Sequence, residues 1–326
     1  MPDSDVATLA EQVIAGDRRA LARAITLIES SRADDREPAR QLLEHLVPRS
    51  GDSIRVGISG VPGVGKSTFI ESLGNHLIDA GHKVAVLAVD PSSAISGGSI
   101  LGDKTRMETL SRRTEAFIRP SPAGETLGGV ARRTRETMFA VEAAGFDVVL
   151  VETVGVGQSE TTVSRMTDMF LLLLLPAGGD ELQGIKRGIV ELADLILVNK
   201  ADGQLELAAQ QSVTDYRKAL MFMAHRADGW QVPVEAMSAL SGEQTPEVWK
   251  TVTEYREQRD KQGLIAQKRA DQAINWMWSE IQNGLVERLK ATPEVAARVT
   301  ELEQAVRDNR ISPTTAADKL MEIFIK

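Results

Sequence analysis

The sequence contains no cysteine in 326 residues. This absence excludes disulfide bonds, catalytic thiolates, iron–sulfur clusters and zinc sites with cysteine ligands. Positive charge is also scarce, because 38 lysines and arginines face 46 aspartates and glutamates, a net charge of −8 at pH 7. No overall positive field is present to hold nucleic acid or an anionic membrane. We therefore expect a cytoplasmic protein that binds neither nucleic acid nor a membrane.

Long hydrophobic runs are missing too. The apolar run at residues 169–175 is only seven residues long, whereas a bilayer requires about 18. The first five residues, MPDSD, have neither the basic start nor the apolar core of a signal peptide. We expect no membrane span and no export signal, and the run suits a strand that is buried on both faces.

Short apolar segments alternate with amphipathic stretches through the middle of the chain. They are rich in valine, isoleucine and leucine and lack polar alternation, which is typical of strands covered by helices on both faces. We therefore predict an α/β fold, a doubly wound and mostly parallel sheet with helical extensions at both ends. The predicted strands are residues 54–59, 84–89, 116–118, 148–152, 169–175, 195–199 and 232–236.

Both ends of the chain have helical periodicity and no strand signal. Ile274, Trp278, Ile281 and Leu285 form one apolar stripe, and Trp276 projects about 200° away from Ile274. The stripe either packs on the protein's own sheet or, since apolar bulk on two faces needs two partners, contacts a second subunit. We predict an N-terminal helical subdomain (1–50), a nucleotide-binding domain (51–242) and a C-terminal helical extension that forms a dimer (243–326).

The first predicted strand runs into a phosphate-binding loop followed by an amphipathic helix. The loop matches G-x-x-x-x-G-K-[ST] and consists of Gly60, Val61, Pro62, Gly63, Val64, Gly65, Lys66, Ser67 and Thr68. Glycines are needed because backbone N–H groups wrap the β-phosphate and a Cβ would obstruct that approach. Lys66 is predicted to reach the β- and γ-phosphate oxygens and Ser67 to bind Mg²⁺. The alternative is a chance glycine-rich turn, which the register of strand, helix, lysine and serine opposes.

A second motif, Asn199-Lys200-Ala201-Asp202, follows the sixth predicted strand. Asp202 can accept hydrogen bonds from guanine N1–H and its exocyclic amine, and adenine offers no such pair. Asn199 is predicted to tie this loop to the phosphate-binding loop, and the stem of Lys200 to lie over the base. Backbone N–H groups that face guanine O6 are predicted at Ser238, Ala239 and Leu240.

Acidic residues follow two further strands and suggest a magnesium and γ-phosphate site. In the carboxylate-x-x-Gly element, Glu152 would hold Mg²⁺ through water and the N–H of Gly155 would contact the γ-phosphate. Asp90 and Asp103 are candidates for Mg²⁺ coordination or for positioning water, and the less favoured alternative for Asp103 is a solvated loop acid. Val156 stands where Ras-type GTPases have their water-orienting glutamine, so we expect slow intrinsic hydrolysis with catalytic groups supplied by another loop or a partner.

Taken together, these motifs and two further segments resemble the MeaB/ArgK family, the G-protein chaperones of adenosylcobalamin-dependent methylmalonyl-CoA mutase. The further segments are residues 97–107, GGSILGDKTRM, and residues 179–188, GDELQGIKRG. The resemblance implies a homodimer that binds and hydrolyses GTP with Mg²⁺, gates loading of adenosylcobalamin, and protects or reactivates the mutase. It also implies Mg²⁺ and switch roles for Asp90, Asp103 and Glu152. Lys186 and Arg187 are then the candidates to compensate for Val156.

Three other functions remain open at this point. A nickel-type metallochaperone GTPase would need histidine-rich or cysteine-containing elements, and this chain has four dispersed histidines. An ATP-dependent kinase or transport ATPase conflicts with Asp202 as a guanine-reading residue. A binding module that never hydrolyses GTP is suggested by Val156. The chain also lacks the Asp-x-His-x-x-Gly pattern of cobalamin enzymes, so we predict no independent cobalamin site.

Overall fold

The computed structural model describes residues 3–90, 107–121, 127–154, 159–176, 187–222 and 229–325. The chain divides into two compact units, residues 1–265 and residues 266–326. Within the described ranges, no helix is both long enough and apolar enough to cross a membrane. The first unit holds the sheet and the predicted nucleotide-binding motifs.

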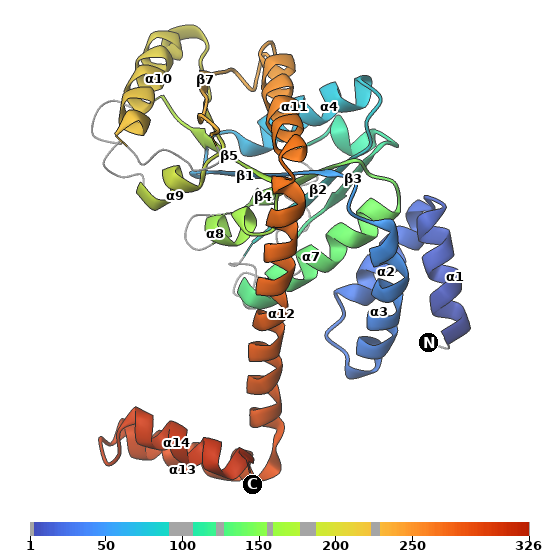
Figure 1. Ribbon diagram of the computed structural model, residues 1–326, viewed down its shortest axis with the longest axis vertical. Helices are drawn as coiled ribbons and strands as arrows, with labels where there is room; N and C mark the ends of the chain where they lie inside the picture. The colour runs from blue at the N-terminus through green and yellow to red at the C-terminus, as the bar shows by residue number, and fades with distance from the viewer. Residues whose placement is uncertain are drawn as a thin grey trace. The chain divides into compact units, whose positions relative to one another are not determined.

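The first unit is built on a seven-stranded sheet in the order β3-β2-β4-β1-β5-β6-β7 (Figure 1). Every pair of neighbouring strands is parallel. This confirms the predicted doubly wound parallel sheet, and the largest boundary difference is at β7, which begins two residues later than predicted. The strands are β1 (Ile54–Gly60), β2 (Val84–Val89), β3 (Ala116–Arg119), β4 (Val148–Thr153), β5 (Met169–Leu174), β6 (Leu195–Val198) and β7 (Val234–Ala236).

The strands β2 and β5 are apolar throughout because helices cover both faces of the sheet. Along β2, Val84 and Val86 enter one core with α4 (Lys66–Asp79) and α11 (Thr245–Lys261). Ala85 and Leu87 enter the opposite core with α7 (Leu127–Ala143). Figure 1 shows α4 and α11 on one side of the sheet and α7 on the other. Successive side chains of a strand point to opposite faces, so two covered faces require an apolar residue at every position.

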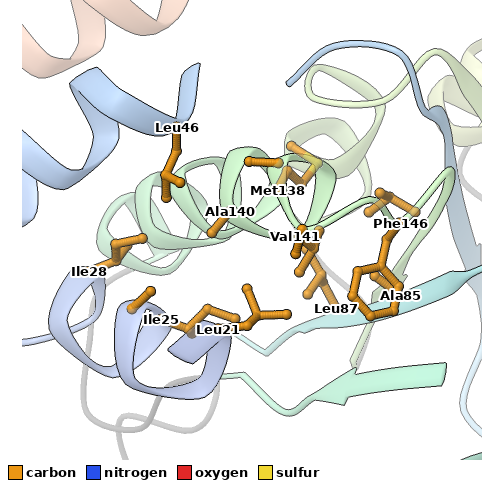
Figure 2. Close-up of a cluster of buried hydrophobic side chains, with 14 of the residues drawn as sticks. Leu21, Ile25, Ile28, Leu46, Ala85, Leu87, Met138, Ala140, Val141 and Phe146 are labelled. Carbon is orange, nitrogen blue, oxygen red and sulfur yellow. The ribbon is translucent and has the colours of Figure 1, made fainter. Parts of the chain in front are cut away.

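The predicted N-terminal helices are α1 (Asp3–Ile14), α2 (Arg18–Ile28) and α3 (Ala33–Leu46). Their apolar stripes belong to the same buried cluster as α7 and one face of the sheet. Figure 2 shows Leu21 and Ile25 of α2 in one cluster with Leu87 of β2 and Val141 of α7. The N-terminal helices therefore share a core with the nucleotide-binding domain.

Arginine side chains close both edges of the sheet. At the β3 edge, Arg18 Nη1 donates to the carbonyl of Ala116 at 2.7 Å and to that of Thr114. At the β7 edge, the guanidinium of Arg217 donates to the carbonyl of Val234 at 2.7 and 3.2 Å. Arg217 lies on α10 (Glu206–Met221), which packs against β6 and β7. Carbonyls that face away from the neighbouring strand thus have donors within the chain.

Short elements complete the first unit, and helices make up the second. The short elements are η1 (Val47–Arg49), η2 (Leu110–Arg112), α8 (Ser159–Ser164), α9 (Arg187–Leu192) and η4 (Gly203–Leu205). The second unit contains most of α12 (Leu264–Ala291), with α13 (Pro293–Arg307) and α14 (Pro313–Ile325). Both α13 and α14 begin at a proline that follows a threonine or a serine, Thr292-Pro293 and Ser312-Pro313. Ser312 caps α14 by accepting from Thr315 N at 3.0 Å, whereas the Thr292 hydroxyl donates back to the carbonyl of Arg288 at 2.9 Å.

The predicted apolar stripe of α12 is largely exposed. Ile274, Trp278, Ile281 and Leu285 have exposed fractions between 41 and 56%. α11, by contrast, buries Val248, Trp249, Val252 and Tyr255 in the same core as α4. α11 belongs to the same compact unit as the sheet, whereas the sequence-based division assigns it to the C-terminal extension (243–326). The functional division into residues 1–50, 51–242 and 243–326 stays a prediction.

Candidate functional site

The phosphate-binding loop joins β1 to α4 at the carboxyl-terminal edge of the sheet. β1 lies between β4 and β5, where the strand order reverses direction, and ligands of open α/β sheets bind at such a point. Gly60 has to be a glycine here, because a Cβ would lie 2.5 Å from the carbonyl oxygen of Leu173. The α4 helix begins at Lys66, so its first N–H groups face the loop and favour an anion.

Lys66 carries the positive charge of this loop. Its Nζ donates to the carbonyl of Gly60 at 2.7 Å and to that of Val61 at 3.4 Å. Ser67 is half-buried and Thr68 is exposed in the first turn of α4. The ammonium group and the Ser67 hydroxyl are thus carried on adjacent residues, as a phosphate and its metal ion require.

Asn199 connects three segments of the site. Its Nδ2 donates to the carbonyl of Val64 at 2.7 Å, and its Oδ1 accepts from the N–H of Ala239 at 2.9 Å. The approach is close enough that a Cβ at Gly65, whose φ is +99°, would lie 2.6 Å from Asn199 Nδ2. This is the link between the two loops that the sequence predicts. The contact of these residues with guanine stays a prediction.

Asp202 lies on the exposed side of the same loop. The hydroxyl of Ser238 donates to Asp202 Oδ2, and Ser238 Oγ accepts from the N–H of Ser241 at 3.2 Å. The neighbouring Lys200 is exposed and has a φ of +60°, which is uncommon for a residue with a side chain. The Asp202 carboxylate is therefore oriented by a hydroxyl from the loop after β7.

The backbone N–H groups predicted for guanine O6 differ in what they bind. The N–H of Ser238 donates to Gln244 Oε1 at 3.1 Å, and that of Ala239 to Asn199. A backbone N–H makes one strong hydrogen bond, so both of these are engaged by the protein. Among the described residues no acceptor is assigned to the N–H of Leu240, whose side chain is 83% exposed. Leu240 is thus the one of the three left to offer its N–H to a base.

Two carboxylates, Asp90 and Glu152, lie at the carboxyl ends of neighbouring strands. Glu152 on β4 is in register with Ala88 of β2, and Asp90 directly follows β2. Their exposed fractions are 6 and 5%. The Asp90 N–H donates to Ser121 Oγ at 3.0 Å, which fixes the backbone at this point. The two strands therefore bring the predicted acids to one edge beside the phosphate-binding loop.

This donor set fits a magnesium ion. Carboxylate and hydroxyl oxygens are the hard ligands that Mg²⁺ prefers, and such sites use one or two carboxylates with substrate phosphates rather than a protein cage. Asp90, Glu152 and Ser67 match that pattern. No cluster of three or more acidic or histidine ligands occurs in the described part of the chain. Asp103, Gly155 and Lys186 lie outside the described residues, as do Val156 and Arg187's side chain.

The structure adds contacts that no motif indicates. The hydroxyls of Ser72 on α4 and Thr245 at the start of α11 are 2.9 Å apart, and 173 positions separate them in sequence. Gln244 holds Ser238, as described above, and the hydroxyl of Thr153 donates to Ser59 at 2.9 Å. The contacts Ser72–Thr245 and Ser59–Thr153 each join single polar residues of distant segments, so local sequence carries no signal for them. The contact between Gln244 and Ser238 spans six positions within one turn and has no motif of its own.

A family model described as methylmalonyl Co-A mutase-associated GTPase MeaB matches residues 21–294. The chain belongs to the MeaB family. GTPase ArgK of Escherichia coli K12 is 44% identical to this MeaB-family chain, over 98% of the chain and 97% of its own length. The mouse methylmalonic aciduria type A homolog, mitochondrial, is 47% identical over 96% of this chain and 78% of its own length.

A solved structure agrees with the fold of this MeaB-family chain. The crystal structure of a LAO/AO transport system kinase is 36% identical, covers 100% of this chain and 99% of its own, and has a TM-score of 0.79. The comparisons confirm the resemblance found in the sequence and the P-loop GTPase fold. The chain is a GTPase of this family, and its motifs are consistent with a bound guanine nucleotide.

Proposed function

We propose that this GTPase uses Mg²⁺ to hydrolyse GTP and acts as a chaperone of adenosylcobalamin-dependent methylmalonyl-CoA mutase. In this role it gates cofactor loading and protects or reactivates the mutase. The observation that carries the proposal is the pair of hydrogen bonds from Asn199, which joins a phosphate-binding loop to a guanine-type loop. It occurs in a chain whose family description names the mutase as the associated enzyme.

The phosphate chemistry follows from Lys66 and the two strand-end carboxylates. Lys66 exchanges its bond to the Gly60 carbonyl for the β- and γ-phosphate oxygens. When bound, Mg²⁺ neutralises charge that develops on the phosphates. Ser67, Asp90 and Glu152 hold it from the chain, and the predicted Asp103, Gly155 and Lys186 complete the site. With Val156 at the position that orients water in Ras-type enzymes, intrinsic hydrolysis is slow and the partner stimulates it.

Guanine rather than adenine is the proposed base. The Asp202 carboxylate, oriented by Ser238, accepts from guanine N1–H and the exocyclic amine, and the Leu240 N–H meets O6. The solved relative is named as a kinase, which motivates ATP as the competing nucleotide. Adenine presents no pair of donors to Asp202 and would leave that carboxylate unmatched.

Base choice can be tested with Asp202→Asn. We expect this variant to lose GTP hydrolysis and to gain hydrolysis of xanthosine triphosphate, whose 2-oxo group accepts from an amide. Asp215→Asn, at a half-buried position of α10, is the matched control and should keep the wild-type preference. An unchanged preference in the Asp202 variant would refute the base assignment, and hydrolysis of ATP in preference to GTP by the wild type would favour the kinase alternative.

The chaperone role needs a separate test with the mutase. Phosphate release from GTP is measured in single turnovers with and without purified methylmalonyl-CoA mutase, and mutase binding is titrated with GDP, GTP and a non-hydrolysable analogue. We expect faster hydrolysis with the mutase and a nucleotide-dependent affinity. Equal rates and nucleotide-independent behaviour would leave a GTPase without this partner.

The proposal includes a homodimer formed by α12. Beside the exposed stripe lies a hollow of about 550 Å³, lined among others by Trp276, Met277 and Leu285. A half-exposed apolar helix face of this kind is costly in water and is typical of an interface. Sedimentation equilibrium should give a dimer for the wild type and for Gln282→Glu, and a monomer for the double variant Trp278→Glu/Ile281→Glu. A wild-type monomer would contradict it.

A cytoplasmic location is also part of the proposal. A chain without cysteine gains nothing from an oxidising compartment, because it has no disulfide to form. Cell fractionation with an antibody against the chain, beside a cytoplasmic marker, checks the location. Recovery with the membrane or secreted fraction would contradict it.

A further inference from the structure

The turn between β7 and α11 holds Ser238 at three of its atoms. The Ser238 N–H donates to Gln244 Oε1 at 3.1 Å, and its carbonyl accepts from the N–H of Gly242 at 3.0 Å. Ser238 Oγ accepts from the N–H of Ser241 at 3.2 Å. The residue is buried, with an exposed fraction of 3%. Its backbone and hydroxyl are therefore fixed by Ser241, Gly242 and Gln244.

The fixed hydroxyl has one proton, and it is given to Asp202. A serine hydroxyl donates once and accepts through its lone pairs. Since Oγ accepts from Ser241, its proton is directed to Asp202 Oδ2. A carboxylate oxygen has two lone-pair sites, so Oδ2 can accept from Ser238 and from a base at once. Ser238 orients Asp202 without occupying its capacity to bind guanine.

Gln244 is the only side chain among these contacts that reaches back from α11. It is the N-cap residue of that helix, and its side chain makes no capping hydrogen bond with the helix N–H groups. N-cap positions favour serine, threonine, aspartate and asparagine, because their short side chains bond to those groups. The side-chain carbonyl of Gln244 accepts from the N–H of Ser238 instead. The residue therefore stabilises the loop after β7 rather than the N-terminus of α11.

The position of Gln244 is itself fixed by the contact between α11 and α4. The next residue, Thr245, is buried, and its hydroxyl lies 2.9 Å from that of Ser72 on α4. Gly242, with a φ of +69°, passes so close that a Cβ would lie 2.8 Å from Ser72 Oγ. α4 is the helix that the phosphate-binding loop opens. Gln244 thus lies between α4, which follows the phosphate-binding loop, and the loop after β7, which is predicted to contact the base.

We propose that Gln244 is a positioning residue for guanine recognition, acting on the base through Ser238 and Asp202. The proposal rests on the assignment of Asp202 as the guanine-reading residue. Without the Gln244 carbonyl, the Ser238 N–H loses its acceptor in a buried turn, and the hydroxyl that orients Asp202 is no longer held in place. We expect the contact between Asp202 and the exocyclic amine of guanine to weaken most when the Ser238 hydroxyl is no longer held in place.

The test compares GDP with inosine diphosphate, which lacks that exocyclic amine. The full-length variants are Gln244→Met, which keeps the length of the side chain without its acceptor, and Gln244→Glu, which keeps an acceptor oxygen. Gln211→Met, at an exposed position of α10 whose side chain donates to Asp215 at 3.0 Å, is the matched control. Dissociation constants for both nucleotides and the melting temperature are measured for each.

We expect Gln244→Met to weaken GDP binding about fivefold, the effect of one lost hydrogen bond. Binding of inosine diphosphate should weaken less, because that nucleotide never contacted Asp202 through an amine. The preference of Gln244→Met for GDP over inosine diphosphate should therefore be lower than that of the wild type. Gln244→Glu should recover most of the preference, and Gln211→Met should keep all of it.

A Gln244→Met protein with the wild-type preference would overturn the proposal, whatever its melting temperature, because a purely structural role changes stability alone. If that variant does not fold, Ser238→Ala tests the same chain of contacts nearer the base, and an unchanged preference there overturns it equally. Asp202→Asn separates the two assignments. If it changes the preference and Gln244→Met does not, only the role of Gln244 fails; if neither changes it, the base assignment fails as well.

Discussion

The two halves of the nucleotide edge are built differently. The base half (Asn199, Asp202 and residues 238–244) is held by bonds among neutral groups and one carboxylate. The phosphate half (residues 60–68, Asp90 and Glu152) gathers an ammonium group and two buried carboxylates. Preset hydrogen bonds select a ligand, whereas concentrated charge acts on a reaction in which charge moves. Changes in the base half should therefore alter which nucleotide binds. Changes in the phosphate half should alter the rate at which the bound nucleotide is hydrolysed.

The largest effect is expected from Lys66→Ala in the phosphate half. Loss of one charged group that stabilises developing phosphate charge should lower the rate constant of GTP hydrolysis about 10²- to 10³-fold. The preference for GTP over inosine triphosphate should persist, because the base half is intact. Single-turnover phosphate release measures both, and Lys250→Ala, at an exposed position of α11, is the control. A changed preference between GTP and inosine triphosphate in the Lys66 variant would contradict the division of roles between the base half and the phosphate half.

The next effect comes from Gly65→Ala, at the contact between the halves. The added Cβ requires a strained φ of +99° and meets Asn199 Nδ2 at 2.6 Å. We expect a loss of about 3 kcal/mol in unfolding free energy, from strain and clash together. Gly63→Ala is the matched control, since its φ is +78° and no atom lies within 4 Å; strain alone costs about 1–2 kcal/mol. Unfolding free energies are measured in urea without nucleotide. Equal losses for Gly65→Ala and Gly63→Ala would contradict the close contact between Gly65 and Asn199.

A smaller effect is expected at the hydrogen bond between α4 and α11. Ser72→Ala and Thr245→Val each remove one hydroxyl of the 2.9 Å pair. Each should lower the unfolding free energy by about 1 kcal/mol. A double-mutant cycle by urea unfolding should show that the two losses are not additive, because the residues share one bond. Additive losses would mean that the helices are not joined by this pair.

The smallest effect is expected at Glu235 on β7. Burial raises the pKa of Glu235, and a hydrogen bond from Thr251 offsets part of that rise. A folded-state pKa above the unfolded value means that ionisation of Glu235 destabilises the fold at high pH, and that this destabilisation disappears below the unfolded pKa of about 4.5. Glu235→Gln should thus raise the urea midpoint slightly at pH 7, and the gain should vanish at pH 4. A gain that persists at pH 4, or a changed nucleotide preference, would contradict this account.

The fold could be predicted from the sequence where one local property decides the structure. Two covered faces require apolar residues at every strand position, so β2 and β5 are visible as continuous apolar runs. The phosphate-binding loop and the loop at Asn199 are contiguous motifs and were visible for the same reason. Sequence alone does not place α11 with the sheet, because helical periodicity shows that a helix has a buried face and not what buries it.

The finer hydrogen bonds of the site could not be predicted. Ser238, Ala239 and Leu240 are equivalent in a motif, since each offers one backbone N–H. Only tertiary structure shows that Gln244 and Asn199 accept from the first two. The contact of Thr245 with Ser72 depends in the same way on two helices meeting. Such contacts join segments that have no periodicity or spacing in common.

The arginines at the two borders of the sheet limit how this protein can associate. Strand addition needs outward carbonyls free to accept from another chain. At β3 and β7, Arg18 and Arg217 already donate to such carbonyls. A second copy, or an aggregating neighbour, therefore meets carbonyls that are already bonded at these two positions, which disfavours strand addition there.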